Sequence, residues 1–489
     1  MERENERLRN ELEKLSQRVS EQDRQIIDLG KQNADLERKL GLKLQNSTTS
    51  SKPPSSDGLA GKQRPRCVSQ RKKSGRKPGG QPGHPGHHRC LFPPKRVDEV
   101  VSIYPAQCGH CGKAFGERAQ TAQGEPQRHQ VTELPEIEAH ITEYQCHKLH
   151  CAKCGKTTQA TLPDEMKGNF GPELTALIAY QTVTCRMPRR VVLESLEHVL
   201  GIPLSLGSVQ KVWEEAGDAV AEPYEELARQ LPQEPVLNSD ETGYRTNGEK
   251  RWLWALVAAG FVFYKVAATR GAEVLVALLG EMFEGILCSD RYAGYTAYHK
   301  GEAQFCWAHF KRNILGAQEI AKSTDAERFC RDALALHARL FRLWHRFRAG
   351  PATRYPIEDR PQLIRKSLPL QKKFFALGET YLDSKDKDVR NLATALFVHC
   401  GEFFVFLEKD GVEPTNNAAE RALRCAVQWR KTSFGSRSAR GETAMARLLT
   451  VTRTCRMQNR NSLHYLAAAV RAHRSGAPVP SLLVKASTT

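Results

Sequence analysis

Apolar side chains recur every three to four positions through the first 44 residues, a stretch without proline. The a positions of its heptads hold Leu12, Val19, Ile26, Asn33 and Leu40, and the d positions hold Leu8, Leu15, Leu29 and Leu36. This repeat is typical of a coiled coil, and the polar Asn33 in the seam favours a dimer in register. We therefore expect residues 1–44 to form a homodimerisation helix. The alternative is a lone amphipathic helix packed on its own domain.

The pattern stops at residue 45. Residues 45–96 nearly lack large apolar side chains and are rich in Ser, Pro, Gly, Lys and Arg. Such a segment cannot bury enough apolar surface to offset the entropy lost on ordering. It is expected to be a flexible basic linker. Its cations either contact phosphates without reading sequence or keep a spacer solvated.

Two CxxC pairs mark residues 97–165 as a small metal domain. The four thiols are those of Cys108, Cys111, Cys151 and Cys154, and each pair is followed by glycine. Four thiolates hold Zn²⁺ tetrahedrally, and the alternation over Glu136–Gln145 predicts a strand of a zinc ribbon. One structural zinc is expected. Neighbouring side chains that could replace a ligand are His110, Cys146, His147 and His150.

Residues 166–232 have helical periodicity. Leu174, Leu177 and Ile178 begin the pattern, and a break at Gly201–Pro203 precedes a helix that holds Val209, Val212 and Trp213. This arrangement fits a helix-turn-helix whose arginines face DNA, namely Arg186, Arg189 and Arg190. An ordinary bundle that supports the next domain fits equally well.

Short apolar runs separated by glycines predict a sheet in residues 233–314. A strand that begins at Val236 leads to Asp240, two runs meet at Gly260 as a hairpin, a helix covers Gly271–Phe283, and a further strand leads to Asp290. This order is that of a ribonuclease-H-like α/β core.

Residues 315–405 have only helical periodicity and are predicted to form an all-α insertion. One stripe holds Phe329, Ala333, Leu336, Leu340, Leu343 and Phe347, and another holds Leu392, Leu396, Cys400, Phe403 and Leu407. The core resumes over 406–460, and a C-terminal helix and tail cover 461–489. The chain is thus expected to be a multidomain α+β protein.

Three acids lie where this layout would bring chemistry together. Asp240 and Asp290 each follow a buried strand, and Glu420 lies in a helix that Asn416 or Asn417 would cap. Paired carboxylates suit Mg²⁺, and two such ions can clamp a phosphodiester during displacement. The alternative is that each acid only caps a helix or closes a turn.

The motifs around the acids are SDETGYR, CSDRYAGY, CWAHFKRN and NNAAERALR, and the linker contains NSTTSSKPPSSDG and GRKPGGQPGHPGHH. Through these motifs nearly the whole chain resembles the insertion sequence 66 family of bacterial transposases. The resemblance implies a ribonuclease-H-like fold, an Asp-Asp-Glu triad at Asp240, Asp290 and Glu420, and two Mg²⁺ ions, or Mn²⁺. It places the ligand at Asp240 and not at Glu241, whose side chain points to the opposite face of the strand.

One departure from the wider Asp-Asp-Glu group concerns a basic residue seven positions after the Glu. This chain has Val427 there, and Arg424, one turn after Glu420, could serve instead. The resemblance also suggests that His309 and Arg312 touch DNA, although a His beside Trp307 is as often structural.

Composition supports a polyanionic partner. The formal charge is +18, and beyond Glu420 the excess of basic residues includes Arg424, Arg430 and Lys431, which are expected to bind the DNA backbone. No stretch has the ~18 uninterrupted apolar residues of a membrane span. We expect a cytoplasmic, nucleoid-associated bacterial protein. Its 14 cysteines are then reduced core residues or metal ligands.

The resemblance implies a transposase that cleaves the ends of an insertion sequence and joins the 3′ hydroxyls to target DNA. Its partners would be the terminal inverted repeats, the target, a second copy of the chain and, as an open point, accessory proteins of the same element. Two alternatives remain: a zinc-containing DNA-binding regulator with an inactive core, and a ribonuclease-H-like nuclease that cleaves without joining.

Overall fold

A computed structural model describes most of the chain beyond residue 124 and parts of the chain before it. The described residues are 14–30, 32–33, 35–36, 83–86, 89–115, 124–163, 168–353 and 355–483. Contacts divide the chain into two compact units, residues 1–62 with 141–489 and residues 63–140. Among the described residues, no helix combines the length and apolar character that crossing a membrane requires. The linker expected at 45–96 lies mostly outside the described residues.

Residues 14–30 are helical, so the helix expected from the heptads is confirmed over that range. The seam side chains of Leu15, Val19 and Leu29 are 56%, 54% and 63% exposed. An exposed apolar stripe on an isolated helix is what a coiled-coil partner would cover. The pairing stays a prediction, and the outer seam residues Leu8, Leu12 and Leu40 lie outside the described residues.

A short antiparallel hairpin encloses the second CxxC pair, with β1 (Lys148–His150) paired to β2 (Thr157–Gln159). The strand expected over Glu136–Gln145 is wrong, because every residue of this described segment is exposed and none has strand pairing. Alternation predicts a strand only where a second strand and an apolar layer receive it. In the other unit, the 3₁₀ helix η3 covers Pro94–Arg96.

Four helices precede the sheet: α2 (Pro172–Val183), α3 (Arg189–Leu200), α4 (Leu206–Ala219) and α5 (Ala221–Gln230). Gly201 ends α3 with a left-handed φ of 63°, and the Ser205 hydroxyl caps α4 by accepting from the Ser208 amide at 3.0 Å. A small apolar cluster that includes Ile178, Val192 and Leu196 holds α2, α3 and α4 together. The helices α2 and α4 also pack on the C-terminal helices, so this segment supports the core.

The sheet has five strands in the order β5-β4-β3-β6-β7. Their bounds are β3 (Val236–Thr246), β4 (Glu249–Val257), β5 (Val262–Ala267), β6 (Ile286–Ser289) and β7 (Ala303–Phe305). The first three are antiparallel neighbours, and β6 and β7 run parallel to β3. The expected hairpin around Gly260 is confirmed as β4 and β5. A helix, α6 (Ala272–Leu279), and the short α7 (Ala293–Tyr298) connect the parallel strands.

Strand β3 is longer than expected. It does not end at Asp240 but continues to Thr246, because Asn247 and Gly248 form a two-residue turn with φ of 51° and 82° that returns the chain as β4. Parallel pairing of β3 with β6, however, stops at Asn238. Asp240 therefore lies just past the point where the parallel half of the sheet ends.

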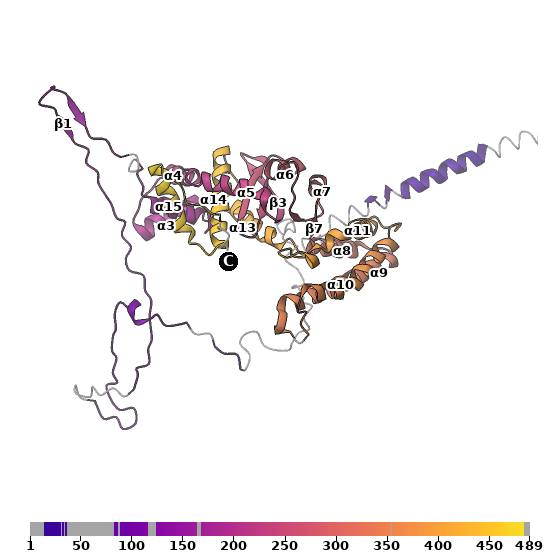
Figure 1. Ribbon diagram of the computed structural model, residues 1–489, viewed down its shortest axis with the longest axis horizontal. Coiled ribbons are helices and arrows are strands. Elements are labelled where there is room, and N and C mark those ends of the chain that lie inside the picture. The colour runs from indigo at the N-terminus through magenta and orange to yellow at the C-terminus, as the bar shows by residue number, and fades with distance from the viewer. Residues whose placement is uncertain are drawn as a thin grey trace, which may run out of the picture. The chain divides into compact units, whose positions relative to one another are not determined.

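The described part of residues 315–405 contains only helices and their connections, as predicted. The helices that cover this segment are α8 (Trp307–Ile320), α9 (Thr324–Ala349), η6 (Gly350–Ala352), α10 (Arg360–Thr380), α11 (Lys387–Val398), η7 (Gly401–Phe403) and α12 (Val405–Glu408). Helices α8 to α11 pack side by side (Figure 1) around an apolar core that also includes side chains of β6 and β7. Both predicted apolar stripes line this core.

The chain ends in α13 (Asn417–Ser433), α14 (Ala439–Met457) and α15 (Ser462–Ser475). Helix α13 packs on β3 and β4, and α14 packs on the edge strand β5. The β5 amides of Val262 and Tyr264 donate to the hydroxyls of Thr454 and Thr450 at 3.1 and 3.0 Å. These threonines satisfy donors that an edge strand would otherwise leave unpaired.

Candidate active site

The pairing of β3 with β6 brings two of the predicted acids together. Asn238 lies opposite Cys288 in the last residue pair of β3 and β6, and extending this register by two residues places Asp240 opposite Asp290, which directly follows β6. Neighbouring strands lie about 4.8 Å apart, so these side chains are neighbours. Burial raises the pKa of Asp240 well above its usual value, and the negative charges of Glu241, Asp290 and Glu420 raise it further. The three predicted acids therefore share one electrostatic environment.

Asn416 positions the third acid. Its side-chain amide donates to the Ser239 carbonyl at 2.7 Å, and its backbone amide donates to Cys306 Sγ at 3.1 Å. Asn416 is the N-cap residue of α13, as one of the two expected alternatives, but its side chain forms no capping hydrogen bond. The amide instead ties the start of α13 to β3. Glu420 follows one turn later.

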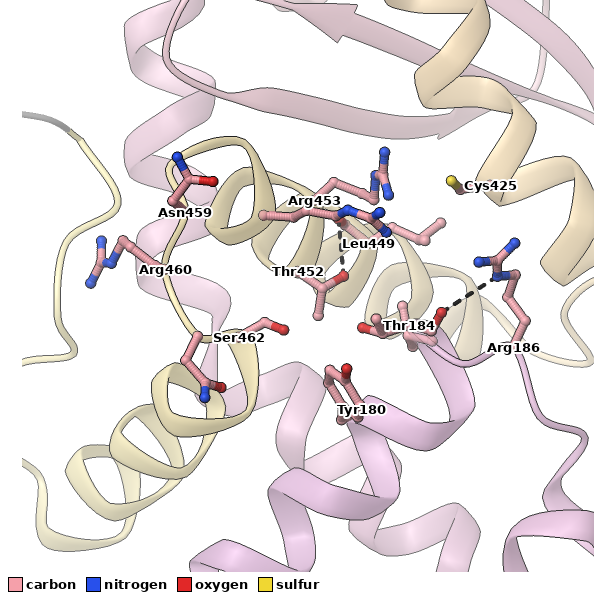
Figure 2. Close-up of a pocket in the computed structure, with 13 residues that line it drawn as sticks. Tyr180, Thr184, Arg186, Cys425, Leu449, Thr452, Arg453, Asn459, Arg460 and Ser462 are labelled. Carbon is pink, nitrogen blue, oxygen red and sulfur yellow. Dashed lines mark hydrogen bonds between the residues drawn. The ribbon is translucent and has the colours of Figure 1, made fainter. Parts of the chain in front are cut away.

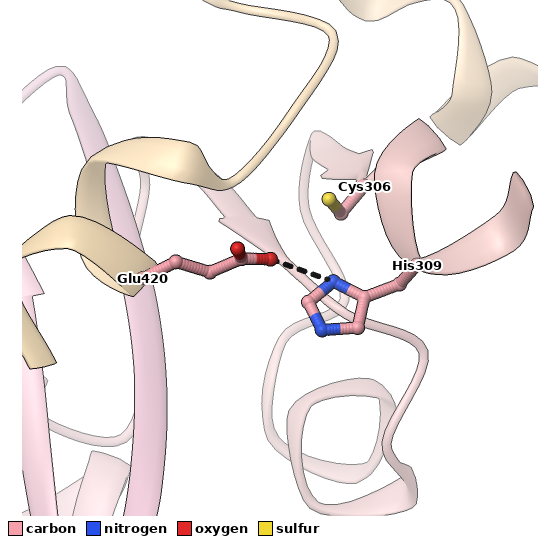
Figure 3. Close-up of side chains that lie close together, drawn as sticks. All are labelled: Cys306, His309 and Glu420. Atoms are coloured by element: carbon pink, nitrogen blue, oxygen red, sulfur yellow. Dashed lines mark ion pairs between the residues drawn. The ribbon is translucent and has the colours of Figure 1, made fainter. Parts of the chain in front are cut away.

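Glu420 points from α13 toward His309 on α8, and Cys306 lies beside them (Figure 3). His309 Nδ1 is 3.5 Å from Glu420 Oε1, and one ligand atom from each of the three residues lies within 4.8 Å of the others. Burial lowers the pKa of His309, although Glu420 and Asp290 oppose the shift. The ring is therefore neutral near pH 7. Burial also raises the pKa of Cys306 to about 11, so its sulfur is a protonated thiol.

Several buried polar atoms at this site lack a partner. Glu420 Oε1, His309 Nδ1 and Asn416 Oδ1 are buried without a hydrogen bond. Unpaired buried polar atoms are uncommon and usually mark a strained or functional place. Asp290 Oδ1 accepts from the Tyr292 amide at 2.9 Å. Within the part of the chain that the structure describes, neither Asp240 nor Asp290 forms an ion pair.

These residues fit a divalent cation. Three carboxylates meet without a basic partner for Asp240 or Asp290, and a positive ion would relieve the repulsion that raises the pKa of Asp240. The unpaired oxygen of Glu420 is available as a ligand. Hard cations such as Mg²⁺ prefer oxygen donors, whereas the protonated Cys306 thiol is a poor ligand for them.

Glu241, the neighbour of Asp240, lies in a different environment. Its carboxylate forms an ion pair with Arg270 and accepts a hydrogen bond from the Tyr295 hydroxyl. Tyr295 also lies within 3.3 Å of the Ser239 hydroxyl, so Ser239 and Glu241 share one face of β3. The alternation of a strand turns Asp240 to the other face. Glu241 thus already has a cationic partner.

The two CxxC turns have the same backbone geometry. The Cys108 and Cys151 amides donate to Lys113 and Lys156 carbonyls at 2.9 and 2.8 Å, and the Cys108 and Cys151 carbonyls accept from the glycine that ends each turn. Those glycines are Gly112 and Gly155, with φ of 72° and 66°. Amides within each turn lower the pKa of Cys108 and Cys151. The turns belong to different units, so their sharing of one zinc stays a prediction.

The predicted DNA-contacting arginines of the helical segment lie in different surroundings. Arg186 has a φ of 61° at the turn after α2 and donates to the side chain of Gln428 on α13. Arg189 stacks over Trp213 with its guanidinium 4.7 Å from the ring centre, and burial lowers its pKa. Arg190 is exposed. Arg189 is therefore engaged in packing the bundle.

Helix α13 carries the other three predicted DNA contacts. Arg424 and Lys431 are exposed. Arg430 is half-buried near Gly243 and Tyr244, and burial lowers its pKa. Exposed cations on the helix that supplies Glu420 place positive charge close to the acids.

Comparison with known proteins agrees with the motifs. A model described as the Transposase IS66 family matches residues 167–444, and a model of a family of unknown function matches residues 1–90. Two uncharacterized Sinorhizobium fredii proteins are similar. Protein y4qI is 27% identical over 256 residues, 48% of this chain and 46% of y4qI. Protein y4hP is 24% identical over 406 residues, 76% of this chain and 71% of y4hP.

The chain spans about half the length of y4qI. Among solved structures, the catalytic domain of the Mos1 mariner transposase covers 39% of this chain and 95% of its own length, with 12% identity and a TM-score of 0.11.

Proposed function

Because the chain belongs to the IS66 family of transposases, we propose that it is a DNA transposase. It cleaves the ends of an insertion sequence and joins the freed 3′ hydroxyls to target DNA by phosphoryl transfer. Asp240, Asp290 and Glu420 are the proposed catalytic acids. The observation that carries the proposal is the meeting of these three carboxylates, which come from distant parts of the sequence. Burial raises the pKa of Asp240, and the charges of Glu241, Asp290 and Glu420 raise it further.

The strand order supports a ribonuclease-H-like core. The order is β3, the antiparallel strands β4 and β5, helix α6 and the parallel strands β6 and β7, as such a core requires. Helix α13 packs on β3 and carries Glu420 in its first turn. The first acid therefore lies on β3, the second directly follows the adjacent strand β6, and the third approaches from a helix. This is a rigid support for catalytic groups.

The proposed cofactors are two Mg²⁺ ions, or Mn²⁺, held by Asp240, Asp290 and Glu420. When bound, such ions would supply positive charge that offsets the charge building up in phosphoryl transfer. The acids would bind them as carboxylates, so protonation of Asp240, whose pKa is raised, opposes binding at low pH.

His309 and Asn416 are proposed to position Glu420. A neutral His309 ring can donate one hydrogen bond toward the Glu420 carboxylate, which lies 3.5 Å away. Asn416 fixes the start of α13 against β3. Glu241 stays away from the reaction because Arg270 and Tyr295 hold it on the other face of the strand.

DNA is the proposed partner. The formal charge of +18 and the exposed Arg190, Arg424 and Lys431 support a backbone contact that weakens as salt rises. Arg430 would help to shape the same surface. Arg189, whose guanidinium stacks on Trp213, is proposed to support this DNA-binding surface.

A structural zinc is proposed for Cys108, Cys111, Cys151 and Cys154. The matching turns and the lowered pKa of Cys108 and Cys151 support thiolate ligands. Elemental analysis should find one zinc per chain, and a Cys108→Ala/Cys151→Ala variant should lose it. Full retention of zinc in that variant would reject the assignment.

Homodimerisation is proposed for residues 1–44, supported by the exposed seam at Leu15, Val19 and Leu29. Light scattering of a peptide of residues 1–44 should give the mass of a dimer. Asn33→Ile should raise its stability and loosen its oligomeric state, because the buried polar residue specifies two strands at a cost in stability. A monomeric peptide at high micromolar concentration would contradict the proposal.

A strand-transfer assay tests the proposed function. The purified chain, Mg²⁺ and linear DNA that ends in the element's own inverted repeats should yield 3′-end cleavage and joined products. Cleavage without joining would identify a nuclease. Specific binding with neither reaction would identify a regulator with an inactive core.

A further inference from the structure

A second polar site lies among α2, α13, α14 and the start of α15. It is a cavity of ≈ 480 Å³ that none of the three acids lines. Four arginines line it: Arg186, Arg453, Arg456 and Arg460. Figure 2 shows Arg186 and Arg453 near Cys425 of α13, with Arg460 and Ser462 across the cavity from Arg186.

The remaining polar lining is made of hydroxyls and of the start of a helix. Tyr180, Thr184 and Thr452 contribute hydroxyl groups, and Ser462 is the first residue of α15. The amino end of a helix carries partial positive charge and favours anions. The lining contains four arginines and no acidic residue, so the cavity is positively charged at neutral pH.

The arginines of this cavity lack counter-charges. Among the described residues, none of the four forms an ion pair, whereas Arg440, Arg471 and Arg474 on the same two helices α14 and α15 each pair with an acid. The Arg453 Nε and Thr184 Oγ1 atoms are buried without a hydrogen-bond partner. Four cations without an acidic partner around one cavity favour an anionic ligand.

We propose that this cavity anchors a phosphate group of a DNA strand. The proposal rests on the proposed function, in which the acid site works on DNA. Guanidinium groups bind phosphate oxygens through paired, charge-assisted hydrogen bonds. Such contacts position a strand without reading its sequence.

Helix α13 connects the cavity to the acids. Glu420 faces the acid site and Cys425 lines the cavity, and five residues of helix advance about 7.5 Å along the axis. The same five residues turn by about 140°, so Glu420 and Cys425 lie on different faces of α13. Arg186 donates a hydrogen bond to the side chain of Gln428, which also lies on α13. A DNA strand that passes over α13 would place a phosphate in the cavity and be fixed in register with the carboxylates.

Calorimetry with inorganic phosphate tests the site without requiring catalysis. The full chain should show saturable binding. An Arg453→Gln/Arg456→Gln variant should lose it, and Arg471→Gln should keep it, because Arg471 is paired with Glu173 outside the cavity. Absent saturation in the unaltered chain, or equal binding in the double variant, would overturn the proposal.

The salt dependence of DNA binding identifies the source of the phosphate. For a fluorescent duplex, the slope of log affinity against log salt should fall by about 0.9 in the double variant, as for the loss of one phosphate contact. Arg471→Gln should leave the slope unchanged. An unchanged slope in the double variant would overturn the assignment to DNA.

Ser462→Glu is an independent variant, which tests the site even if the double variant fails to fold. The first turn of a helix tolerates an acid, and the new carboxylate would occupy the cavity. This variant should keep the thermal stability of the unaltered chain and lose phosphate binding. Phosphate binding at full strength would count against the proposal. If strand transfer is absent while the phosphate and slope results hold, the proposed function fails and the cavity assignment stands.

Discussion

Helix α8 separates two regions that are built on opposite principles. Trp307, its first residue, is fully buried in the core of the helical insertion, and its indole nitrogen donates to the Phe403 carbonyl at 2.6 Å. His309, two residues later, faces Glu420 and has a ring nitrogen with no hydrogen-bond partner. One half-turn of helix thus divides a satisfied core from an unsatisfied polar site.

The same contrast holds over the described part of each region. Buried side-chain nitrogen and oxygen atoms without a partner occur at His309, Asn416 and Glu420, and none is found among the described residues of 315–405. The insertion core is aromatic, with Trp307 packed against Phe310, Phe374 and Phe403. A fully satisfied core stabilises the insertion, whereas the unpaired polar groups of the acid site remain available to a ligand.

The largest expected effect is on the acid site. Asp240→Asn, Asp290→Asn and Glu420→Gln should each lower strand transfer roughly a thousandfold or more, since an amide keeps the shape but removes a charged cation ligand. Hydrogen-exchange protection of the insertion should stay unchanged. The strand-transfer assay measures the first quantity.

Glu241→Gln is the matched control in the same strand. Because Arg270 and Tyr295 hold Glu241 on the opposite face, this variant should keep most of the activity. A variant as inactive as Asp240→Asn would show that the wrong neighbour has been assigned to the site.

The insertion should respond in the opposite way. Trp307→Ala removes the central aromatic ring of its core and should cost about 3–5 kcal/mol of local stability. Hydrogen exchange of peptides from α9 and α10 measures that loss. Leu368→Ala, at a position 45% exposed on α10, is the control and should change protection little. Equal effects of the two variants would contradict the described core.

A smaller effect is a pH dependence within the insertion. Burial lowers the pKa of His337 to about 4 from 6.5, and Lys311 adds to the shift. As pH falls below 6.5, the unfolded chain takes up the proton first, so stability is lost between pH 6.5 and about 4. The whole loss is about 3 kcal/mol.

His337→Phe should remove this dependence, since the ring lies between aromatic neighbours, 4.3 Å from Phe341 and 5.8 Å from Trp307. The difference in α9 hydrogen-exchange protection between the variant and the unaltered chain isolates the contribution of this one histidine. Parallel pH profiles would mean that His337 takes up its proton equally in both states.

Periodicity predicted the insertion well and the acid site in part. The stripes from Phe329 and Leu392 are local patterns that one helix expresses by itself. The approach of Asp240 to Asp290 was also within reach, because each acid follows a short apolar run and these two runs pair in parallel. The apolar run before Asp240 does not predict the extension of β3. That extension depends on the hairpin turn at Asn247–Gly248.

Features made by tertiary contacts were beyond such patterns. Asn416 looked like a helix cap, but its side chain bonds to Ser239 on a distant strand. The stacking of Arg189 on Trp213 likewise joins two separate helices. The arginine-lined cavity draws on α2, α13, α14 and α15 at once. No single stretch of sequence carries that information.

Binding of Mn²⁺, followed by electron paramagnetic resonance of the free ion, tests the central assignment most directly, because it needs neither DNA nor turnover. The unaltered chain should bind Mn²⁺, more weakly as the pH falls and protons compete for Asp240, whose pKa is raised. Asp240→Asn, Asp290→Asn and Glu420→Gln should each weaken binding, and Glu241→Gln should not. Equal Mn²⁺ binding by the unaltered chain and all three triad variants would contradict a shared cation site at these acids.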